Sequence, residues 1–182
     1  MSDPLRIRKA RIADLPAIES MYAEVIDTMV GTPSDCQWRR GRRPTHGHLV
    51  RAIERGDLFV GTWRVDGTED VAGAFVLDDD IPDDYDAVPW LVDVAPDEVA
   101  VLHLLAVSPA ARGDGIARRL MHAARQAALQ RGAKALRLDV FPNNEPAIRL
   151  YRSCGMDDLG LHPFTFPGCE QSEARLFELD LR

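Results

Sequence analysis

The chain has 182 residues, of which 46% are hydrophobic and 28% charged, and these values are typical of one folded domain covering residues 1–182. The formal net charge of −7 repels phosphate backbones, so nucleic acid is a poor partner. No apolar run approaches the roughly 20 residues that cross a bilayer, and the first residues lack the basic patch and apolar run of a secretory signal. We therefore expect a cytoplasmic protein that does not bind membranes.

Local patterns in the first half predict three strands and two helices. In chain order they are an edge strand at residues 5–8, a helix at 13–28, a long loop at 31–47, a short helix at 48–55, and strands at 58–65 and 71–77. Asp14 is expected to cap the first helix, and Asp66-Gly67 predicts a tight hairpin turn between the last two strands.

The segment from Asp78 to Asp86 contains six aspartates. Two interpretations stay open. The favoured one is a solvated loop, because runs of like charge repel one another and stay hydrated. The other is an acidic wall, including Asp83, Asp84 and Asp86, that attracts an amine substrate.

The second half alternates strands with helices. The predicted elements are a strand at 99–107 that is apolar enough to be buried on both faces, a helix at 115–131, a strand at 136–141 with Asp139 inside it, a helix at 145–153, and an alternating strand at 175–181 that closes the sheet. Gly155 is the expected stop signal of the helix before it.

Three cysteines are present, Cys36, Cys154 and Cys169, and they show no metal-ligand spacing. The odd number and the spacing favour reduced thiols over a disulfide framework or a zinc site. We expect no metal site, and a catalytic thiol stays open as the less favoured alternative.

The most informative segment is the turn after the strand at 99–107, where Arg112-Gly-Asp-Gly-Ile-Ala117 leads directly into a helix. Glycines allow close approach of the backbone to a ligand, and free N–H groups at a helix N-terminus attract phosphate. Neither the Gly-x-Gly-x-x-Gly pattern of dinucleotide folds nor the Gly-Lys-Ser/Thr ending of a P-loop is present. The segment predicts a different kind of pyrophosphate cradle.

Several motifs occur together with this turn and in a fixed order. They are Leu105-Ala-Val-Ser-Pro109, the Arg/Gln-x-x-Gly-x-Gly/Ala pattern at 112–117, Asn144-Glu-Pro-Ala-Ile-Arg-Leu-Tyr151 and Cys154-Gly-Met156. Together they resemble the Gcn5-related N-acetyltransferase (GNAT) superfamily, most closely over residues 99–156. The strand Leu102-His-Leu-Leu-Ala-Val107 resembles a bacterial subgroup with an "IHRLAV"-type strand, although Leu104 stands in place of the usual arginine.

The resemblance implies an α/β (α+β) fold with a mixed, mostly antiparallel central sheet that is flanked by helices and splayed beside Val107. It also implies acetyl-CoA as the acyl donor. The backbone of Leu105, Ala106 and Val107 would pair with the pantetheine arm like an added strand. The N–H groups of the turn would hold the pyrophosphate, namely those of Arg112, Gly113, Asp114, Gly115, Ile116 and Ala117. Asn144 would contact the arm or help to position the second helix.

Acetyl transfer to an amine needs a base and an acid, because an ordinary amine has a pKa near 10 and must be neutral to attack. Tyr151 matches the tyrosine that faces the CoA sulfur in this superfamily, and a packed aromatic is its other interpretation. His103 is a candidate base that would share a strand face with Val101 and Leu105, and a core histidine is the alternative. Glu98 is the fallback base.

Trp38 and Trp90 are candidates for lining an acceptor pocket, or else pack around their loops. The predicted function is direct acetyl transfer from acetyl-CoA to a primary amine of a small molecule or amino acid derivative. Two alternatives stay open: a protein or peptide N-acetyltransferase, and a non-enzymatic acyl-CoA-binding module. The resemblance also allows a homodimer, since dimers are common in the superfamily.

Overall fold

The computed structural model describes residues 5–65, 68–166 and 169–182 and shows one open sheet packed between helices. The strands are β1 (Arg6–Lys9), β2 (Leu58–Val65), β3 (Thr68–Asp78), β4 (Val99–Val107), β5 (Ala135–Val140), β6 (Asp157–Pro163) and β7 (Glu173–Asp180). The α-helices are α1 (Leu15–Met29), α2 (His46–Arg55), α3 (Ile116–Gln130) and α4 (Glu145–Ser153). Short 3-10 turns lie at Ile12–Asp14, Asp83–Ala87, Pro96–Glu98 and Pro109–Ala111. The predicted fold class is confirmed.

The sheet has the order β1-β2-β3-β4-β5-β7-β6, and the described neighbours are antiparallel except β4 and β5, which run parallel. The prediction that the last strand closes the sheet is wrong, because β7 pairs with β5 on one side and with β6 on the other. The sequence patterns did not predict β6, because Gly160 adopts a positive φ of 86° and the register shifts between Asp158 and Gly160. That irregularity removes the clean alternation that marks a strand.

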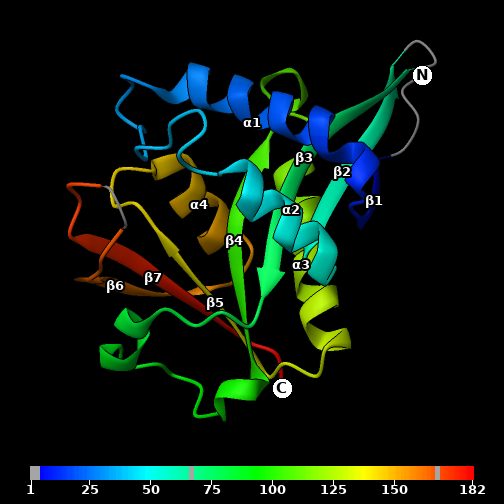
Figure 1. Cartoon of the computed structure of the whole chain (residues 1–182). Coiled ribbons are helices and arrows are strands. Elements are labelled where there is room, and N and C mark those ends of the chain that lie inside the picture. Colours follow the sequence, from blue (N-terminus) through cyan, green and yellow to red (C-terminus); the bar gives the residue numbers. More distant parts are fainter. Residues whose placement is uncertain (1–4, 66–67, 167–168) are drawn as a thin grey trace.

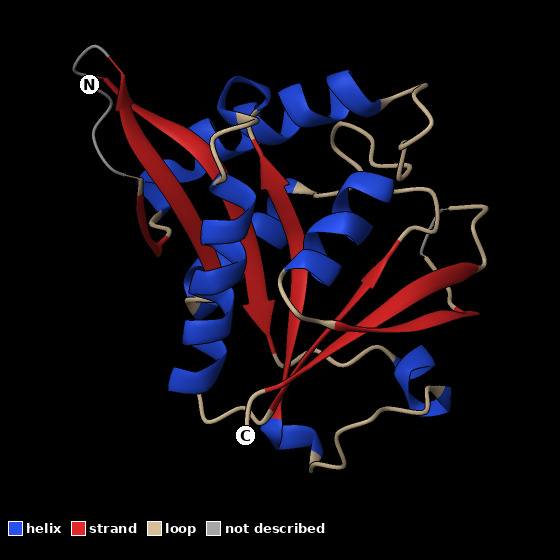
Figure 2. Ribbon diagram, turned by 180° about the vertical axis from the view of Figure 1, so that it is seen from behind, coloured by secondary structure: helices blue, strands red, loops and turns tan. Residues whose placement is uncertain are grey.

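Helices cover both faces of the sheet (Figures 1 and 2). On one face α3 and α4 pack Leu120, Ala124 and Ile148 against strand residues such as Phe75 and Leu136. On the other face α1 and α2 bury a second cluster, which includes Leu15, Ile18, Tyr22, Leu49, Val60 and Ala106. None of the helices in these segments has the length and apolar character needed to cross a membrane.

Most predicted boundaries lie within a few residues of the observed ones. α2 begins at His46 rather than 48, because Thr45 Oγ1 accepts a hydrogen bond from the His48 N–H at 3.1 Å and caps the helix. Asp14 occupies the N-cap position of α1, but its carboxylate binds Arg8 and the N–H of Arg11 instead of the helix. The predicted turn at Asp66-Gly67 lies outside the described residues.

The parallel strands β4 and β5 diverge, as predicted (Figure 1). Their pairing covers only Val99–Val101 against Ala135–Arg137, so the rest of β4 lacks a neighbour on that side among the described residues. α4 lies beside β5 where the two strands diverge. Figure 2 shows the same divergence from behind. One edge of β4 is therefore free along residues 102–107.

β4 carries a bulge at Leu104, which has a φ of 53°. Opposite it, Val76 pairs with His103 and Ala74 with Ala106, so one extra residue is accommodated in β4. The bulge places Leu104 in the cluster under α1, whereas Leu105 packs toward α3. The prediction that His103 shares a face with Leu105 is therefore wrong, because the extra residue reverses the alternation between them.

Close approach of β3 to β4 and α3 requires glycine at position 73. A Cβ there would lie 2.6 Å from the Ala106 carbonyl oxygen and 2.8 Å from Leu120 Cδ1. We expect Gly73→Ala to lower the free energy of unfolding by about 1–3 kcal/mol, because backbone and a buried leucine must move. Urea unfolding measures the change. Gly47→Ala is the control, since its Cβ would meet only Arg51 Nη1 at 3.4 Å; equal losses in both variants would contradict the packing argument.

Candidate functional site

A cavity of about 480 Å³ opens where β4 leaves β5. Its lining comes from the free part of β4, the end of α1, the loop before α2, the end of β5, and α4. The lining includes polar or reactive side chains and the strand residues beside them, namely Cys36, Trp38, Arg43, His103, Leu105, Ala106, Val107, Arg112, Ala117, Asp139, Asn144 and Tyr151.

One end of the cavity faces the turn before α3. Arg112 and Ala117 line it, and Arg112 Nη2 donates to Thr28 Oγ1 at 3.1 Å at the end of α1. Gly113 and Gly115 have positive φ values of 94° and 71°, which favour glycine. A Cβ at either would meet no atom within 4 Å, so the turn faces open space.

The N–H groups of this turn point to an anion site. Within the described chain, no backbone carbonyl accepts from the N–H groups of residues 113–118, as is usual for the first turn of a helix. Asp114 lies in this turn. Ile116 is the first residue of α3, and its side chain is buried in the core. Unpaired N–H groups and the positive end of the helix dipole together suit a diphosphate.

The wall between this turn and the bulge is the free edge of β4. Leu105, Ala106 and Val107 line the cavity there. Ala106 and Val107 pair with β3 on their other edge, so main-chain groups on the cavity side are available to an extended, amide-bearing ligand. Asn144 also lines the cavity, and its Oδ1 accepts from the Ala147 N–H at 3.4 Å, which caps α4.

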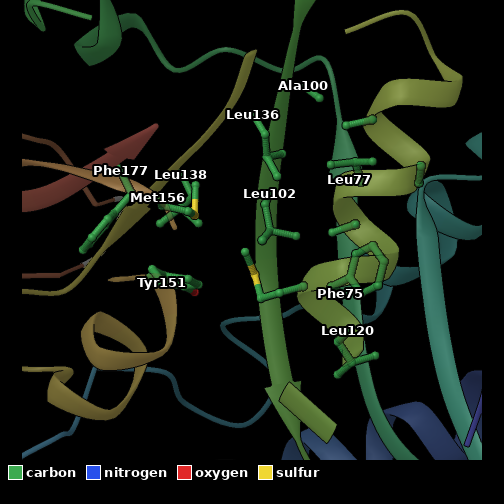
Figure 3. Packing of buried hydrophobic residues seen from close by; sticks show 14 of the residues in the cluster. Phe75, Leu77, Ala100, Leu102, Leu120, Leu136, Leu138, Tyr151, Met156 and Phe177 are labelled. Atoms are coloured by element: carbon green, nitrogen blue, oxygen red, sulfur yellow. The ribbon is translucent and has the colours of Figure 1, made fainter. Parts of the chain in front are cut away.

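Tyr151 projects from α4 toward β4 (Figure 3). The residue is 7% exposed, and its ring packs on Phe177 with 5.4 Å between centroids. No described residue hydrogen bonds to its hydroxyl, although the residue lines the cavity. Burial raises the pKa of Tyr151, so the phenol stays protonated and can donate a proton or a hydrogen bond.

His103 lies at the bulge, at the opposite end of the cavity wall from Arg112. Its Nε2 is 3.3 Å from Oδ1 of Asp78, the last residue of β3, and both side chains are largely buried. Burial disfavours the charged imidazole, but the hydrogen bond to Asp78 and the negative charges of Asp78 and Asp139 outweigh it and raise the pKa of His103. In its neutral form the imidazole can accept a proton, and the carboxylate beside it would stabilise the charged form.

Asp139 is a third polar group at this end, and sequence reasoning did not place it in the site. Tyr85 donates from its hydroxyl to Asp139 Oδ1 at 3.1 Å. Burial raises the pKa of Asp139, and the positive charges of His103 and Arg43 oppose that rise. The available signal was a carboxylate inside a buried strand, which needs a partner or a function. Arg43 also lines the cavity, and no sequence pattern singled it out.

Two predicted residues do not join the site. Trp90 donates to the Tyr85 carbonyl at 2.9 Å and stacks under Arg137, 4.2 Å from the ring centroid, outside the cavity lining. Glu98 pairs with Lys134, and this hydrogen bond lowers its pKa, so it is a poor base as well as a distant one. Trp38 does line the cavity, edge-on to Tyr22.

The acidic segment after β3 has two parts. Asp83 and Asp86 are exposed, Asp84 accepts from the Thr165 N–H, and none of the three lines the cavity. Tyr85 between them is buried and reaches Asp139. The segment therefore contributes to the site through Tyr85 and through Asp78, which pairs with His103, rather than through Asp83, Asp84 and Asp86.

Cys36 is the one cysteine in the lining, and it is buried. Burial raises the pKa of its thiol to about 11, so the nucleophilic thiolate is scarce at neutral pH. Across the residues with described positions, no group of three or more His, Cys, Asp or Glu side chains is arranged to hold a metal ion.

The sequence profile of the acetyltransferase (GNAT) family matches residues 16–156. The chain belongs to this family. An N-acetyltransferase from Staphylococcus aureus Mu50 superposes with a TM-score of 0.70 at 20% identity, covering 99% of this chain and 100% of that one. A putative acetyltransferase from Salmonella typhimurium, solved with its cofactor acetyl-CoA, gives a TM-score of 0.67 at 18% identity, covering 99% and 95%. These likenesses establish the GNAT fold.

Curated relatives match shorter stretches. An uncharacterized protein of Mycobacterium leprae is 41% identical over 83 residues, which are 46% of this chain and 22% of that protein. A streptothricin acetyltransferase of Escherichia coli is 36% identical over 69 residues, 38% of this chain and 40% of that protein. The chain thus matches less than half the length of either relative.

Proposed function

We propose that this GNAT protein transfers an acetyl group from acetyl-CoA to a primary amine of a small molecule or amino acid derivative. One observation carries the proposal. A single cavity runs along the free edge of β4 from the turn at residues 112–117, where the N–H groups of residues 113–117 donate to no backbone carbonyl of the described chain, to His103, which pairs with Asp78. His103 and Val107 pair with Val76 and Gly73, three residues apart in β3. At 3.3 Å per residue the two ends are roughly 10 Å apart, which leaves room for an extended arm between them.

The residues of the donor end fit a diphosphate-bearing thioester. The N–H groups of the turn before α3 would bind the pyrophosphate, and the edge of β4 at residues 105–107 would pair with the amides of the arm. Asn144 would help to position α4, because its side chain caps the first turn of that helix. Acetyl-CoA supplies the activated acyl group and a thiolate leaving group.

Proton transfer is assigned to His103 and Tyr151. As the amine nitrogen bonds to the acyl carbon, His103 takes a proton from that nitrogen, and Asp78 stabilises the imidazolium that forms. As the carbon–sulfur bond breaks, the protonated phenol of Tyr151 donates to the sulfur. The neutral thiol of Cys36 supports direct transfer without a covalent enzyme intermediate.

We expect Tyr151→Phe to lower kcat by about 10- to 100-fold, the effect of losing one hydrogen bond to a developing charge. The KM for acetyl-CoA should change little, because the ring keeps its packing against Phe177. Release of free CoA measures the rate. A variant that loses affinity for acetyl-CoA at unchanged kcat would show that Tyr151 only packs against the donor.

The proposal is tested by a CoA-release assay with acetyl-CoA against amines, amino acids and short peptides, paired with calorimetry of acetyl-CoA binding. Turnover of small amines or amino acids supports it. Acetylation of peptides alone would favour a protein acetyltransferase. Tight binding without transfer to any amine would favour a binding module, and absence of acetyl-CoA binding at high micromolar concentration would contradict all three.

A further inference from the structure

Arg43 lines the cavity, and no side chain or carbonyl of residues 5–65, 68–166 and 169–182 accepts a hydrogen bond from its guanidinium. It lies in the loop between α1 and α2 and lines the cavity beside the bulge of β4. Its Nε is buried without a hydrogen-bond partner, and within the described residues no ion pair includes it. Arginine is always charged and carries five donors, so a half-buried guanidinium whose Nε reaches neither a partner nor solvent is unfavourable.

Other arginines in comparable positions are satisfied. Arg112, which also lines the cavity, donates to Thr28. Arg175 likewise has a buried Nε without a partner, but its Nη1 pairs with Asp158 at 2.9 Å. The lack of any partner therefore distinguishes Arg43 from these two and needs an explanation.

The charge of Arg43 acts at the acceptor end of the cavity. Burial lowers the pKa of His48, and the charges of His103 and Arg43 lower it further. The same charge opposes the burial-driven rise in the pKa of Asp139. Arg43 is thus electrostatically coupled to the groups around the proton acceptor, whereas Arg112 lies at the turn that would bind pyrophosphate.

Asp139 and Arg43 line one cavity without pairing with each other. Tyr85 donates to Asp139 Oδ1, and no other described side chain hydrogen bonds to this carboxyl group. A cavity lined by a carboxylate, an imidazole and a guanidinium that has no partner among the described residues is complementary to a molecule that carries one positive and one negative group. The planar fork of arginine matches the two oxygens of a carboxylate or of a related oxyacid.

We propose that the acceptor is a zwitterionic amino acid or close analogue, whose anionic oxyacid group binds Arg43 while its amine faces His103 and Asp139. This inference rests on the proposed acetyl transfer and narrows its substrate class. Arg43 is then a specificity-determining residue, because an amine without the anionic group leaves the guanidinium unsatisfied.

The test compares matched substrates: α-amino acids, the amines formed by removing their carboxylates, and their carboxamides. Wild-type protein should use the acids with kcat/KM about 10- to 100-fold above the decarboxylated amines, the value of a charge-assisted hydrogen bond. Arg43→Gln should remove that preference by lowering kcat/KM for the acids alone, and Arg43→Lys should keep part of it. Arg42→Gln is the matched control, since Arg42 is exposed and outside the cavity lining.

Several results would overturn the inference. They are equal use of acids and decarboxylated amines by the wild type, an equal loss for both in Arg43→Gln, and a raised KM for acetyl-CoA in place of a changed acceptor preference. If Arg43→Gln does not fold, the wild-type substrate series and Arg43→Lys decide. If no amine is acetylated at all, the proposed function fails separately, and calorimetry with amino acids then tests the anion site alone: binding to the wild type but not to Arg43→Gln upholds it, and absence of binding refutes it.

Discussion

Replacing His103 with glutamine is expected to lower kcat by about 10²- to 10⁴-fold, the usual contribution of a general base. Glutamine keeps a polar side chain of similar size beside Asp78 but cannot accept the amine proton at neutral pH. The KM for acetyl-CoA should stay near the wild-type value, because the turn before α3 and the edge of β4 are unchanged. Steady-state CoA release with the best amine found in the panel measures both constants.

The pH dependence separates a base from a histidine that only packs. Imidazole accepts a proton only when neutral, so kcat/KM should rise with pH through the pKa of His103, which the structure holds above its ordinary value. Asp78→Asn removes the negative charge that stabilises the imidazolium. The rising limb of the profile should therefore move to lower pH in this variant, while its plateau falls.

Glu98→Gln is the control for both measurements. Glu98 is paired with Lys134 outside the cavity, so its loss should leave kcat and the pH profile as in the wild type. If Glu98→Gln lowers kcat as much as His103→Gln does, Glu98 rather than His103 is the base. If the pH profile of kcat/KM is the same in Asp78→Asn as in the wild type, His103 only packs in the site and is not the base.

Local signals in the sequence predicted much of the fold. β2, β4 and α4 begin and end where apolar runs, a cap and a glycine stop indicate, at Leu58–Val65, Val99–Val107 and Glu145–Ser153. The turn before α3 was also placed correctly between its strand and its helix. In each case the information is contained in neighbouring residues, because turns, caps and buried strands follow from short-range sterics and hydrogen bonding.

The acceptor end of the site could not be predicted in the same way. Asp78, Asp139 and Arg43 come from β3, β5 and a loop, and only the order of strands in the sheet brings them near His103. The bulge at Leu104 is stabilised from a distance, since Tyr22 of α1 donates to the Leu104 carbonyl at 2.7 Å. A leucine with positive φ costs roughly 1–2 kcal/mol, so no propensity rule would place it there.

A buried ion pair anchors the segment that carries Tyr85. Glu178 of β7 is fully buried and accepts from the N–H groups of Leu91 and Val92 at 2.7 and 3.0 Å. Its other oxygen accepts from Arg137 Nε at 2.9 Å, and Arg137 also donates to the Val92 carbonyl at 3.0 Å. The segment between β3 and β4 is thereby fixed to the sheet on the face where Tyr85 meets Asp139.

Glu178→Ala is expected to lower the free energy of unfolding by about 3–5 kcal/mol, because it leaves Arg137 charged and buried without its partner. Equilibrium unfolding in urea measures this loss. Glu173→Ala on the same strand is the matched control, since Glu173 is exposed and its replacement should change stability by no more than about 0.5 kcal/mol.

The double variant Arg137→Met/Glu178→Leu tests the cause of that loss. If the unpaired charge is responsible, removing both charges should recover a large part of the stability lost in Glu178→Ala, because apolar side chains of similar size fill the same space without desolvated charge. The two N–H groups of Leu91 and Val92 would still lack their acceptor, so recovery should be incomplete. A double variant as unstable as Glu178→Ala would mean instead that these two backbone hydrogen bonds, rather than the ion pair, hold the segment in place.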